Sequence, residues 1–417
     1  MRMTSLFEVR TGRLRLPLAV VTAVLVAEGA VLLLRPRDGV IEPAPVNVRS
    51  YFSEHELARA RDFRRPQLAL AGGQAAIEIA VLVLLVLRPP TRLRTPFRRP
   101  LVAGALAGGA LSVIVAVAPL PLGAVARARA VDAGLITQSW GGWAGDVAKS
   151  TMIGAVMTSA GAALLLGLMR RFPRAWWAPG SALAVGLGAV FLYAGPVALD
   201  PLFNKFKPLP EGPVRSSVLD LARQAAVKVG EVYEVDASRR TTTANAYVTG
   251  LGHTKRVVLY DTLLRRFSRD ETRLVVAHEL GHVHYDDVPR GLLYLALVAP
   301  AALFAAAQLT DRLSPRGIGP GAPAALPAAA LALVLVSAGV GVISNQLSRR
   351  VEARADTYSL ALTSLPRPFI SSERRLAVQN FAEPDPPAWQ TALLGTHPPI
   401  LSRIGAAVAY ERGARAG

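Results

Sequence analysis

Seven apolar stretches, each close to the length of helix that crosses a bilayer, constrain the fold of this 417-residue chain more than any other feature. A helix of about 20 predominantly apolar residues spans the hydrocarbon core of a membrane. The stretches cover residues 16–34, 68–87, 101–125, 152–169, 178–199, 291–309 and 322–343. Hydrophobic residues form 52% of the chain and charged residues only 18%, which is too apolar for one soluble domain of this length. The sequence therefore predicts a mainly α-helical, polytopic membrane protein.

The basic residues cluster where a membrane protein would need them. The formal net charge is +18, and arginines gather between apolar stretches at residues 88–99 and 170–174. Such clusters favour anionic lipid headgroups over nucleic acid, so we expect anionic lipids and no nucleic acid among the partners. The preference for arginine over lysine is typical of high-GC bacterial genomes and suggests a bacterial plasma membrane. The chain has no cysteine, which excludes disulfides and thiol chemistry.

Hydropathy divides the chain into four regions. Five predicted transmembrane helices occupy residues 1–199, and a polar region follows at 200–290. Two more transmembrane helices lie in residues 291–347, and a second polar region covers 348–417. The functional residues of a seven-helix membrane protein with this layout are expected in the two polar regions.

The first polar region combines helix and strand patterns. Apolar residues at helical spacing predict a helix over 214–229 that stops at Gly230. The segment 232–238 has the composition of a strand, and alternation around the turn at 250–252 predicts a β-hairpin. This mixture predicts a small α+β domain.

A short motif marks the start of the next helix. Ser268 and Glu271 form a Ser-x-x-Glu capping box ahead of an apolar run, which predicts a helix that starts near Arg269. Pro289 marks the predicted end of this helix. Three of the six histidines in the chain fall in its second half, just before the sixth predicted span.

Two of these histidines have the spacing of a metal site. His278 and His282 are four residues apart, so both imidazoles project from one helix face and can reach the same ion. Glu279 lies beside that face, where its carboxylate can contact a metal-bound water without binding the metal. In zinc peptidases with this His-Glu-x-x-His pattern, zinc lowers the pKa of bound water to about 7 and the glutamate accepts its proton. The alternative is a pair of metal-free histidines on a helix surface.

A catalytic zinc site usually has three protein ligands, so one more is expected. His284 faces away from the other imidazoles, and Asp286, four residues after His282, is a geometric possibility. Glu352 and Asp356 share a helical face, where one carboxylate can bind the metal and the other can orient a ligating imidazole. The competing interpretation is a solvated face on which the two acids pair with nearby arginines, namely Arg349, Arg350 or Arg354.

In combination, the motifs resemble one family of membrane enzymes. The matching blocks are "DPLFNKFKPLPEG" at 200–212, "DASRRTTTANAYVTGLGHTKRVVLYDTLL" at 236–264, "HELGH" at 278–282, "EARAD" at 352–356 and "THPP" at 396–399. They are similar to the type I CAAX prenyl proteases, which are integral-membrane zinc metallopeptidases, and the match covers residues 200–403. The five N-terminal spans resemble that family in layout alone.

The resemblance implies a mainly helical fold with about seven transmembrane helices and a zincin-like α+β metalloprotease domain that carries a small β-hairpin. It also implies roles for the matching residues. His278, His282 and Glu352 would bind one Zn2+ per chain. Glu279 would act as the general base and later as the acid, and Asp356 would hold His278.

Four further residues receive roles from the same resemblance. His397 would donate a hydrogen bond to the oxyanion, although a histidine before two prolines also suits a plain turn. Arg403 has the position of a family arginine near the site, or is a solvated arginine. Asn245 and Ala246 would lie on an edge strand that binds the substrate backbone by strand addition, unless the segment is an ordinary hairpin. The family often has His or Ser before this Asn-Ala pair, and the chain has Thr243 and Ala244 there.

These features predict a membrane-embedded zinc endopeptidase whose partners are prenylated CAAX-type or other membrane-associated peptides and proteins. A quality-control protease for misfolded membrane proteins would share the chemistry but not the substrate. From other classes, a seven-helix zinc transporter and an inactive metal-binding scaffold are alternatives, and the presence of Glu279 argues against the scaffold. The resemblance implies a cytoplasmic catalytic region, and the oligomeric state is left open.

Overall fold

Seven long apolar helices organise the molecule. The structure is a computed structural model that describes residues 3–90, 93, 97–250, 252–319 and 321–416. Among these residues, seven helical segments are long and apolar enough to span a membrane: Leu14–Leu34, Glu54–Leu87, Pro100–Val117, Trp140–Arg171, Trp177–Leu202, Asp287–Leu313 and Pro323–Thr363. They coincide with the seven predicted stretches and confirm the polytopic helical fold. Parts of the arginine-rich loop at 88–99 and of the hairpin turn at 250–252 lie outside the described residues.

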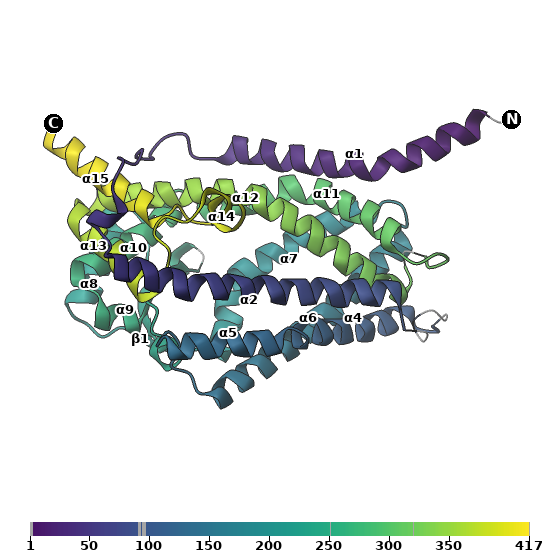
Figure 1. Cartoon of the computed structure of the whole chain (residues 1–417), viewed down its shortest axis with the longest axis horizontal. Helices are drawn as coiled ribbons and strands as arrows, with labels where there is room; N and C mark the ends of the chain where they lie inside the picture. The colour runs from purple at the N-terminus through teal and green to yellow at the C-terminus, as the bar shows by residue number, and fades with distance from the viewer. Residues whose placement is uncertain (1–2, 91–92, 94–96, 251, 320, 417) are drawn as a thin grey trace.

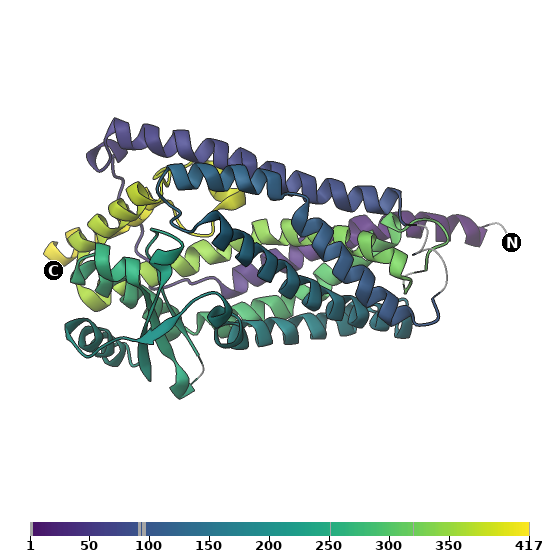
Figure 2. The same cartoon turned by 90° about the horizontal axis from the view of Figure 1, so that it is seen from below.

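The long helices lie side by side and give the molecule an elongated shape, with the two chain termini at opposite ends (Figures 1 and 2). They are α1 (Met3–Leu34), α2 (Glu54–Leu87), α4 (Pro100–Val117), α6 (Trp140–Arg171), α7 (Trp177–Ala198), α11 (Asp287–Leu313) and α12 (Leu326–Thr363). Helix α1 packs on α11 and α12, α4 packs on α6, and α7 packs on α11. Helix α2 contacts α12 and the shorter α5 (Leu120–Asp132).

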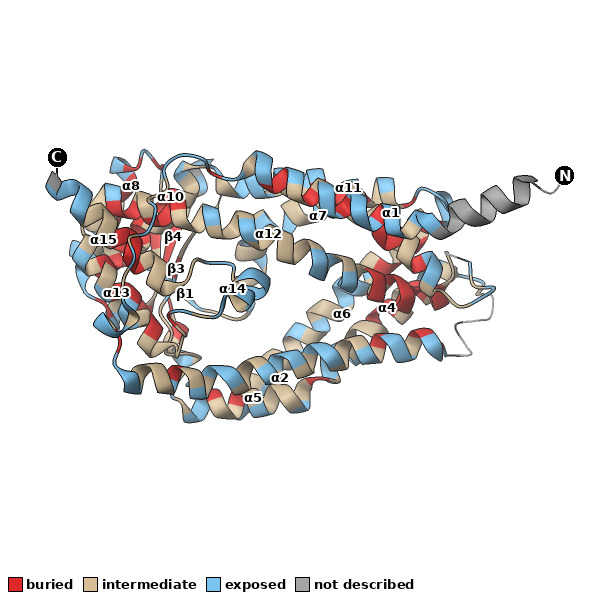
Figure 3. Ribbon diagram, turned by 45° about the horizontal axis from the view of Figure 1, so that its top comes forward, coloured by how far each residue is buried: buried red, intermediate tan, exposed pale blue. Residues whose placement is uncertain are grey.

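Many residues along these helices are exposed, as the pale blue segments in Figure 3 show, and large apolar residues are among them. Leu18, Leu25, Leu33, Leu106 and Val156 are each at least 64% exposed. Water would make such surfaces costly over this length, whereas lipid tails are as apolar as the side chains themselves. The exposed leucines and valines therefore agree with helices that lie in a bilayer.

One end of the bundle carries a polar region built around a four-stranded sheet. Its strands are β1 (Phe206–Pro208), β2 (Glu231–Val235), β3 (Ala246–Thr249) and β4 (Arg256–Tyr260), in the order β1-β2-β4-β3. Strands β3 and β4 are antiparallel, with Ala246 opposite Leu259 and Thr249 opposite Arg256. The predicted hairpin is therefore present, and β3 forms one edge of the sheet.

Helices cover the sheet and enclose the core of the polar region. They are α8 (Pro213–Gln224), α9 (Asp261–Arg266), α10 (Arg269–His284), α13 (Pro366–Gln379), α14 (Ala388–Leu394) and α15 (Ile400–Ala416). Leu221 of α8, Leu259 of β4 and Leu280 of α10 are fully buried in one cluster. This packing holds α10 against the sheet on one side, while its other side faces α12.

Helix α12 connects the membrane bundle to the polar end without a break. It runs from Leu326 to Thr363, so the boundary that hydropathy suggests at residue 347 falls inside it. Hydropathy changes along this helix, but no residue interrupts its backbone hydrogen bonding. The seventh span and the segment with Glu352 and Asp356 are consequently one rigid element.

Two predicted helix ends are corrected by local backbone geometry. Helix α8 ends at Gln224 rather than at residue 229, because Ala226 adopts a left-handed conformation with φ of 55°. The N–H of Val227 then bonds a carbonyl of the last turn at 2.9 Å, which closes the helix. The third span ends at Val117 rather than at residue 125, and α5 begins after Pro119.

Helix α10 has the predicted start and a different end. The Ser268 hydroxyl accepts a hydrogen bond from the Glu271 N–H at 3.2 Å, and the Glu271 carboxylate accepts the Ser268 N–H at 2.8 Å, which completes the capping box. The helix ends at His284, because Asp286 is left-handed with φ of 53°. Pro289 lies instead in the first turn of α11, where its missing N–H costs nothing.

Candidate metal centre and active site

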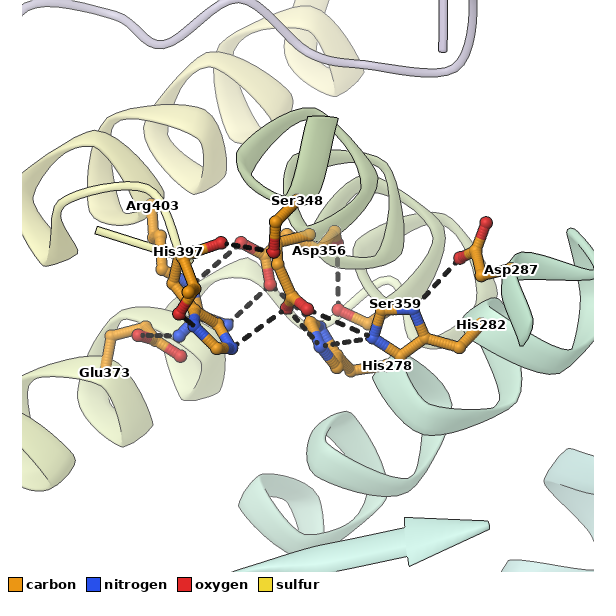
Figure 4. A network of polar contacts seen from close by, with 11 residues as sticks. His278, His282, Asp287, Ser348, Asp356, Ser359, Glu373, His397 and Arg403 are labelled. Atoms are coloured by element: carbon orange, nitrogen blue, oxygen red, sulfur yellow. Dashed lines mark hydrogen bonds and ion pairs between the residues drawn. The ribbon is translucent and has the colours of Figure 1, made fainter. Parts of the chain in front are cut away.

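Close packing of α10 on α12 brings the two histidines to the acids. A side-chain carbon at Gly281 would lie 3.2 Å from the Tyr358 ring and 3.4 Å from the backbone of Ala355, both on α12. Such contacts are tighter than most Cβ contacts, so a larger residue would push the two helices apart by a few tenths of an ångström. His278 and His282 therefore project across a short gap toward α12, as Figure 4 shows.

Three side chains from the two helices converge on one point. The Nε2 atoms of His278 and His282 are 3.2 Å apart. The Glu352 carboxylate lies 3.1 Å from the first and 3.7 Å from the second of these nitrogens. Within the described part of the chain, His278, His282 and Glu352 are the group of His and acid side chains whose ligand atoms lie close enough, within 4.8 Å, to hold one ion.

The protonation of the two imidazoles indicates what this point can bind. The Nδ1 atom of His278 lies 2.9 Å from Asp356, and that of His282 lies 3.0 Å from Asp287. Each carboxylate can only accept, so each Nδ1 carries the proton and each Nε2 of a neutral ring carries a lone pair. When both rings are neutral, the two lone pairs face each other and cannot form a hydrogen bond, whereas a tetrahedral zinc with Zn–N bonds of about 2.0–2.1 Å separates its nitrogens by about 3.3 Å. The two imidazoles and the carboxylate therefore fit a metal ion.

The charges around His278 favour a cation. Burial opposes protonation of this imidazole, but the hydrogen bonds that the protonated ring donates to Asp356 and Glu352, together with the charge of Asp356, outweigh this effect and raise the pKa of His278 to about 10. A proton and a metal ion compete for the same lone pair, so the acids that stabilise one also stabilise the other. The surroundings of this nitrogen therefore attract positive charge.

Behind His278, a buried chain of charged groups extends to α15 and α13. Arg403 donates two hydrogen bonds to Asp356, from Nε at 2.7 Å and from Nη2 at 2.6 Å, and its Nη1 lies 2.7 Å from Glu373. Burial and the Asp356 charge raise the pKa of Glu373 to about 7, against the opposing effect of Arg403. This bidentate clamp holds Asp356 in the orientation that His278 needs (Figure 4).

Asp287, the partner of His282, was not among the site residues predicted from the sequence. Its carboxylate bridges the His282 ring and the guanidinium of Arg354, which is itself buried. Asp286, which the sequence offered as a possible third ligand, is the N-cap of α11 and does not belong to the metal-binding group. The doublet of acids after the histidine motif was the available signal, but the left-handed turn at Asp286 decides which one meets His282.

The remaining sequence alternatives can also be compared with the structure. His284 stacks on Tyr358 with a ring distance of 4.7 Å and lies outside the metal-binding group. The arginines near Glu352 and Asp356 do not pair with them, because Arg354 binds Asp287, Arg350 lies near Glu42, and Arg349 binds backbone carbonyls. The face with the two acids is therefore turned to the histidines rather than to solvent.

His397 reaches the same site from the loop before α15. Its Nε2 lies 3.3 Å from the Glu352 carboxylate, and its Nδ1 lies 3.0 Å from the Thr396 hydroxyl. Three polar side chains of α12 donate hydrogen bonds to backbone carbonyls of this loop and of the preceding α14: Asn345, Ser348 and Arg349. A single helix thus positions both Glu352 and the loop that carries His397.

Glu279 lies between two cavities. It lines one of about 130 Å3, together with Asn245 and His397, and another of about 370 Å3, together with Tyr247 of β3. Among the described residues, none forms a hydrogen bond or ion pair with the Glu279 carboxylate. Ala246 is the first residue of the edge strand β3, and Asn245 directly precedes it. A chain added along β3 would therefore pass both cavities and Glu279.

Replacement of Asp287 by asparagine is expected to weaken metal binding by about 10- to 100-fold. The amide keeps the shape but no longer carries the charge that orients and polarises His282. The matched control is Asp286→Asn, which changes the neighbouring acid and leaves His282 untouched. Competition with a fluorescent zinc chelator gives both affinities, and equal values for the two variants would contradict a role for Asp287.

Comparison with known proteins agrees with this geometry. The family model described as "Peptidase family M48" matches residues 208–411. The chain is 33% identical to the "Uncharacterized metalloprotease YhfN" of Bacillus subtilis over 304 residues, which cover 70% of each chain. It is also 31% identical to a "CAAX prenyl protease 1 homolog" of Oryza sativa over 233 residues, and so spans about half the length of that protein.

A solved structure shows the same fold over nearly the whole chain. The crystal structure of S. mikatae Ste24p superposes with a TM-score of 0.73 and covers 95% of this chain and 99% of its own, at 20% sequence identity. The fold is therefore shared beyond the segment that the family model matches. From its sequence relatives, its fold and its seven membrane helices, the chain belongs to peptidase family M48 and is a multi-pass membrane metalloendopeptidase related to the type I CAAX prenyl proteases.

Proposed function

We propose that this protein is a zinc-dependent endopeptidase that cleaves membrane-associated peptides, with prenylated CAAX-type sequences as the leading substrate class. The observation that carries the proposal is the pair of imidazole Nε2 atoms 3.2 Å apart, with the Glu352 carboxylate beside them and the unpartnered Glu279 carboxylate next in sequence. A donor set of two histidines and one glutamate is that of catalytic zinc in several peptidases. The site would thus have three ligands and a carboxylate free for proton transfer.

His278, His282 and Glu352 would hold the zinc. When bound, the ion would supply a Lewis acid that lowers the pKa of water and polarises a peptide carbonyl. Asp356 and Asp287 each keep one imidazole in the tautomer that presents Nε2. Arg403 acts on the site through Asp356, so we assign it a positioning role rather than a catalytic one.

Glu279 would take the proton from the attacking water and return it to the amine of the departing peptide. Glu279 lines both cavities, which supports this role. A peptide that passes from one cavity to the other would place its scissile bond next to the Glu279 carboxylate. His397 would donate an N–H hydrogen bond to the oxygen of the attacked carbonyl. Glu352, which lies 3.3 Å from His397, keeps that ring turned toward the site.

The substrate would bind by strand addition to β3, with Asn245 and Ala246 contacting its backbone. The larger cavity is bounded by Leu192 and Tyr193 of α7 and by Val288 of α11, all from helices of the membrane bundle. Such a wall suits an apolar side chain or a lipid group attached to the substrate. This position supports a membrane-associated substrate over a soluble one.

The acid limb of kcat/KM is expected above the pH at which an ordinary glutamate ionises, about 4.3. Burial raises the pKa of Glu279, and the opposing effects of His278 and His282 are smaller. A general base works as the carboxylate, so activity falls as the pH drops through this raised pKa. Rates measured from pH 4 to 8, with zinc content determined at each pH, test the expectation; loss of zinc over the same range would assign the limb to the ligands instead.

The substrate class is tested with one peptide in three forms: farnesylated, geranylgeranylated and unmodified. We expect purified protein in lipid to cleave the prenylated forms faster. Equal cleavage of all three, together with degradation of an unfolded membrane protein, would favour the quality-control alternative.

The transporter alternative receives no support from the relatives. A bacterial plasma membrane with a cytoplasmic site completes the proposal, and protease accessibility of tagged loops in inverted vesicles tests the orientation.

A further inference from the structure

A third cavity, larger than the two beside Glu279, is lined by Asp356 but by neither histidine of the metal centre. Its volume is about 470 Å3, and it is bounded by the end of α1, the segment that follows α1, α12 and α15. Four arginines line it: Arg35, Arg349, Arg350 and Arg403. The proposed peptidase mechanism leaves this cavity unused.

The cavity carries an excess of positive charge. Its four arginines face two carboxylates, Glu42 and Asp356, so two positive charges remain in excess. Arg403 already binds Asp356 with two hydrogen bonds. The Glu42 side chain is 82% exposed and lies 3.4 Å from Arg350, so this pair is weak.

The other two arginines have no carboxylate partner among the described residues. Arg349 donates to the carbonyl oxygens of Thr391 and Gly395, at 2.9 and 2.6 Å. Arg35 forms no ion pair with any residue that the structure describes. Two guanidinium groups therefore border the cavity without a compensating charge, which is the arrangement expected of an anion site.

The position of the cavity relative to the membrane indicates the source of the anion. Val31, in the last turn of the first span, lines the cavity, and Arg35, another lining residue, directly follows that span. On α12 the apolar stretch ends near residue 343, so Gln346 and Arg349 lie about 5 and 9 Å further along the axis. Each headgroup layer is about 5–7 Å thick beyond the hydrocarbon core. The cavity therefore begins beside the edge of the hydrocarbon core, at Val31 and Arg35, and extends along α12 through the depth of the headgroup layer to Asp356.

We propose that this cavity binds the phosphate-bearing headgroup of an anionic phospholipid. Guanidinium groups match phosphate oxygens with paired hydrogen bonds, and Val31 of the first membrane span lines the same cavity. The headgroup lies beside Arg403 and Asp356, which hold His278 on the other side. Lipid and metal site are thus separated by one ion pair.

The test is a lipid titration of the full-length, detergent-solubilised protein followed by native mass spectrometry. Phosphatidylglycerol is compared with phosphatidylcholine, and with inorganic phosphate as the free anion. Wild-type protein is expected to prefer phosphatidylglycerol, and the double variant Arg35→Gln/Arg350→Gln is expected to bind it about tenfold or more weakly. The matched control is Arg223→Gln/Arg269→Gln, which removes the same charge from two exposed arginines of the polar region, on α8 and at the start of α10. Neither lines the cavity, so this variant should bind as wild type does.

Three outcomes would overturn the proposal. The first is equal binding by the double variant and the control, which would place the lipid elsewhere. The second is binding of inorganic phosphate as tight as that of phosphatidylglycerol, which would make the cavity a site for a soluble anion. The third combines two results for the double variant: lipid binding is unchanged, and activity is lost on peptides with a free C-terminus but kept on amidated peptides. This outcome would assign the cavity to the C-terminal carboxylate of the substrate. Zinc content and melting temperature verify that both variants fold, and the lipid readout does not depend on proteolysis.

Discussion

Glu279→Gln is expected to lower kcat/KM by about 10²–10⁴-fold while the protein keeps its zinc. The amide has the shape of the carboxylate but cannot accept a proton from water. Because Glu279 lies outside the group formed by His278, His282 and Glu352, its replacement should leave metal binding intact. The measurement is cleavage of a fluorogenic farnesylated peptide, with zinc determined on the same sample by mass spectrometry.

The control for this variant is Glu54→Gln, which neutralises a carboxylate whose side chain is 64% exposed at the start of α2. It should retain wild-type activity. A Glu279→Gln enzyme that holds zinc and cleaves at the wild-type rate would rule out Glu279 as the base. Wild-type protein that holds zinc but cleaves no prenylated peptide would instead remove the CAAX assignment and leave the metal site unaffected.

Glu352→Gln is expected to produce the second large effect, which is loss of the metal itself. The change replaces a charged ligand by a neutral amide and leaves two imidazoles as the only strong donors. Zinc affinity should therefore fall by more than about 100-fold. This is the upper limit expected for Asp287→Asn, which removes only a hydrogen-bond partner of a ligand. Activity should fall with it, since no other described residue completes the group.

Chelator titration and thermal unfolding together test this prediction. A metal that binds only the folded protein stabilises it, so a chelator should lower the melting temperature of the wild type. It should leave that of Glu352→Gln unchanged, because the variant holds little zinc. If the variant retains zinc with wild-type affinity, the third ligand is another residue and the site must be redrawn.

Much of the architecture follows from patterns within short segments. Each membrane span depends on a run of about 20 apolar residues, and the start of α10 depends on the short segment from Ser268 to Glu271. The spacing of His278 and His282 places both rings on one helix face, whatever that helix packs against. Such features are local, so composition and periodicity are sufficient to predict them.

Helix ends were less predictable, because single backbone conformations decide them. The left-handed residues Ala226 and Asp286 end α8 and α10 where neither glycine nor proline marks a stop. The unbroken α12 shows the opposite case, in which hydropathy changes but the helix continues through Glu352. A single backbone conformation changes neither the hydropathy nor the periodicity of the sequence, so these patterns do not record it.

The sequence by itself determined the seven spans, the two-histidine motif and, through resemblance, the acids of α12. Only the tertiary structure decided that Asp287 rather than Asp286 meets His282, and that Arg403 clamps Asp356 across 47 residues of chain. It also revealed the arginine-lined cavity, whose walls come from the two ends of the sequence. The physical reason is that charges and lone pairs act over a few ångströms of space, and folding alone sets which distant residues share that space.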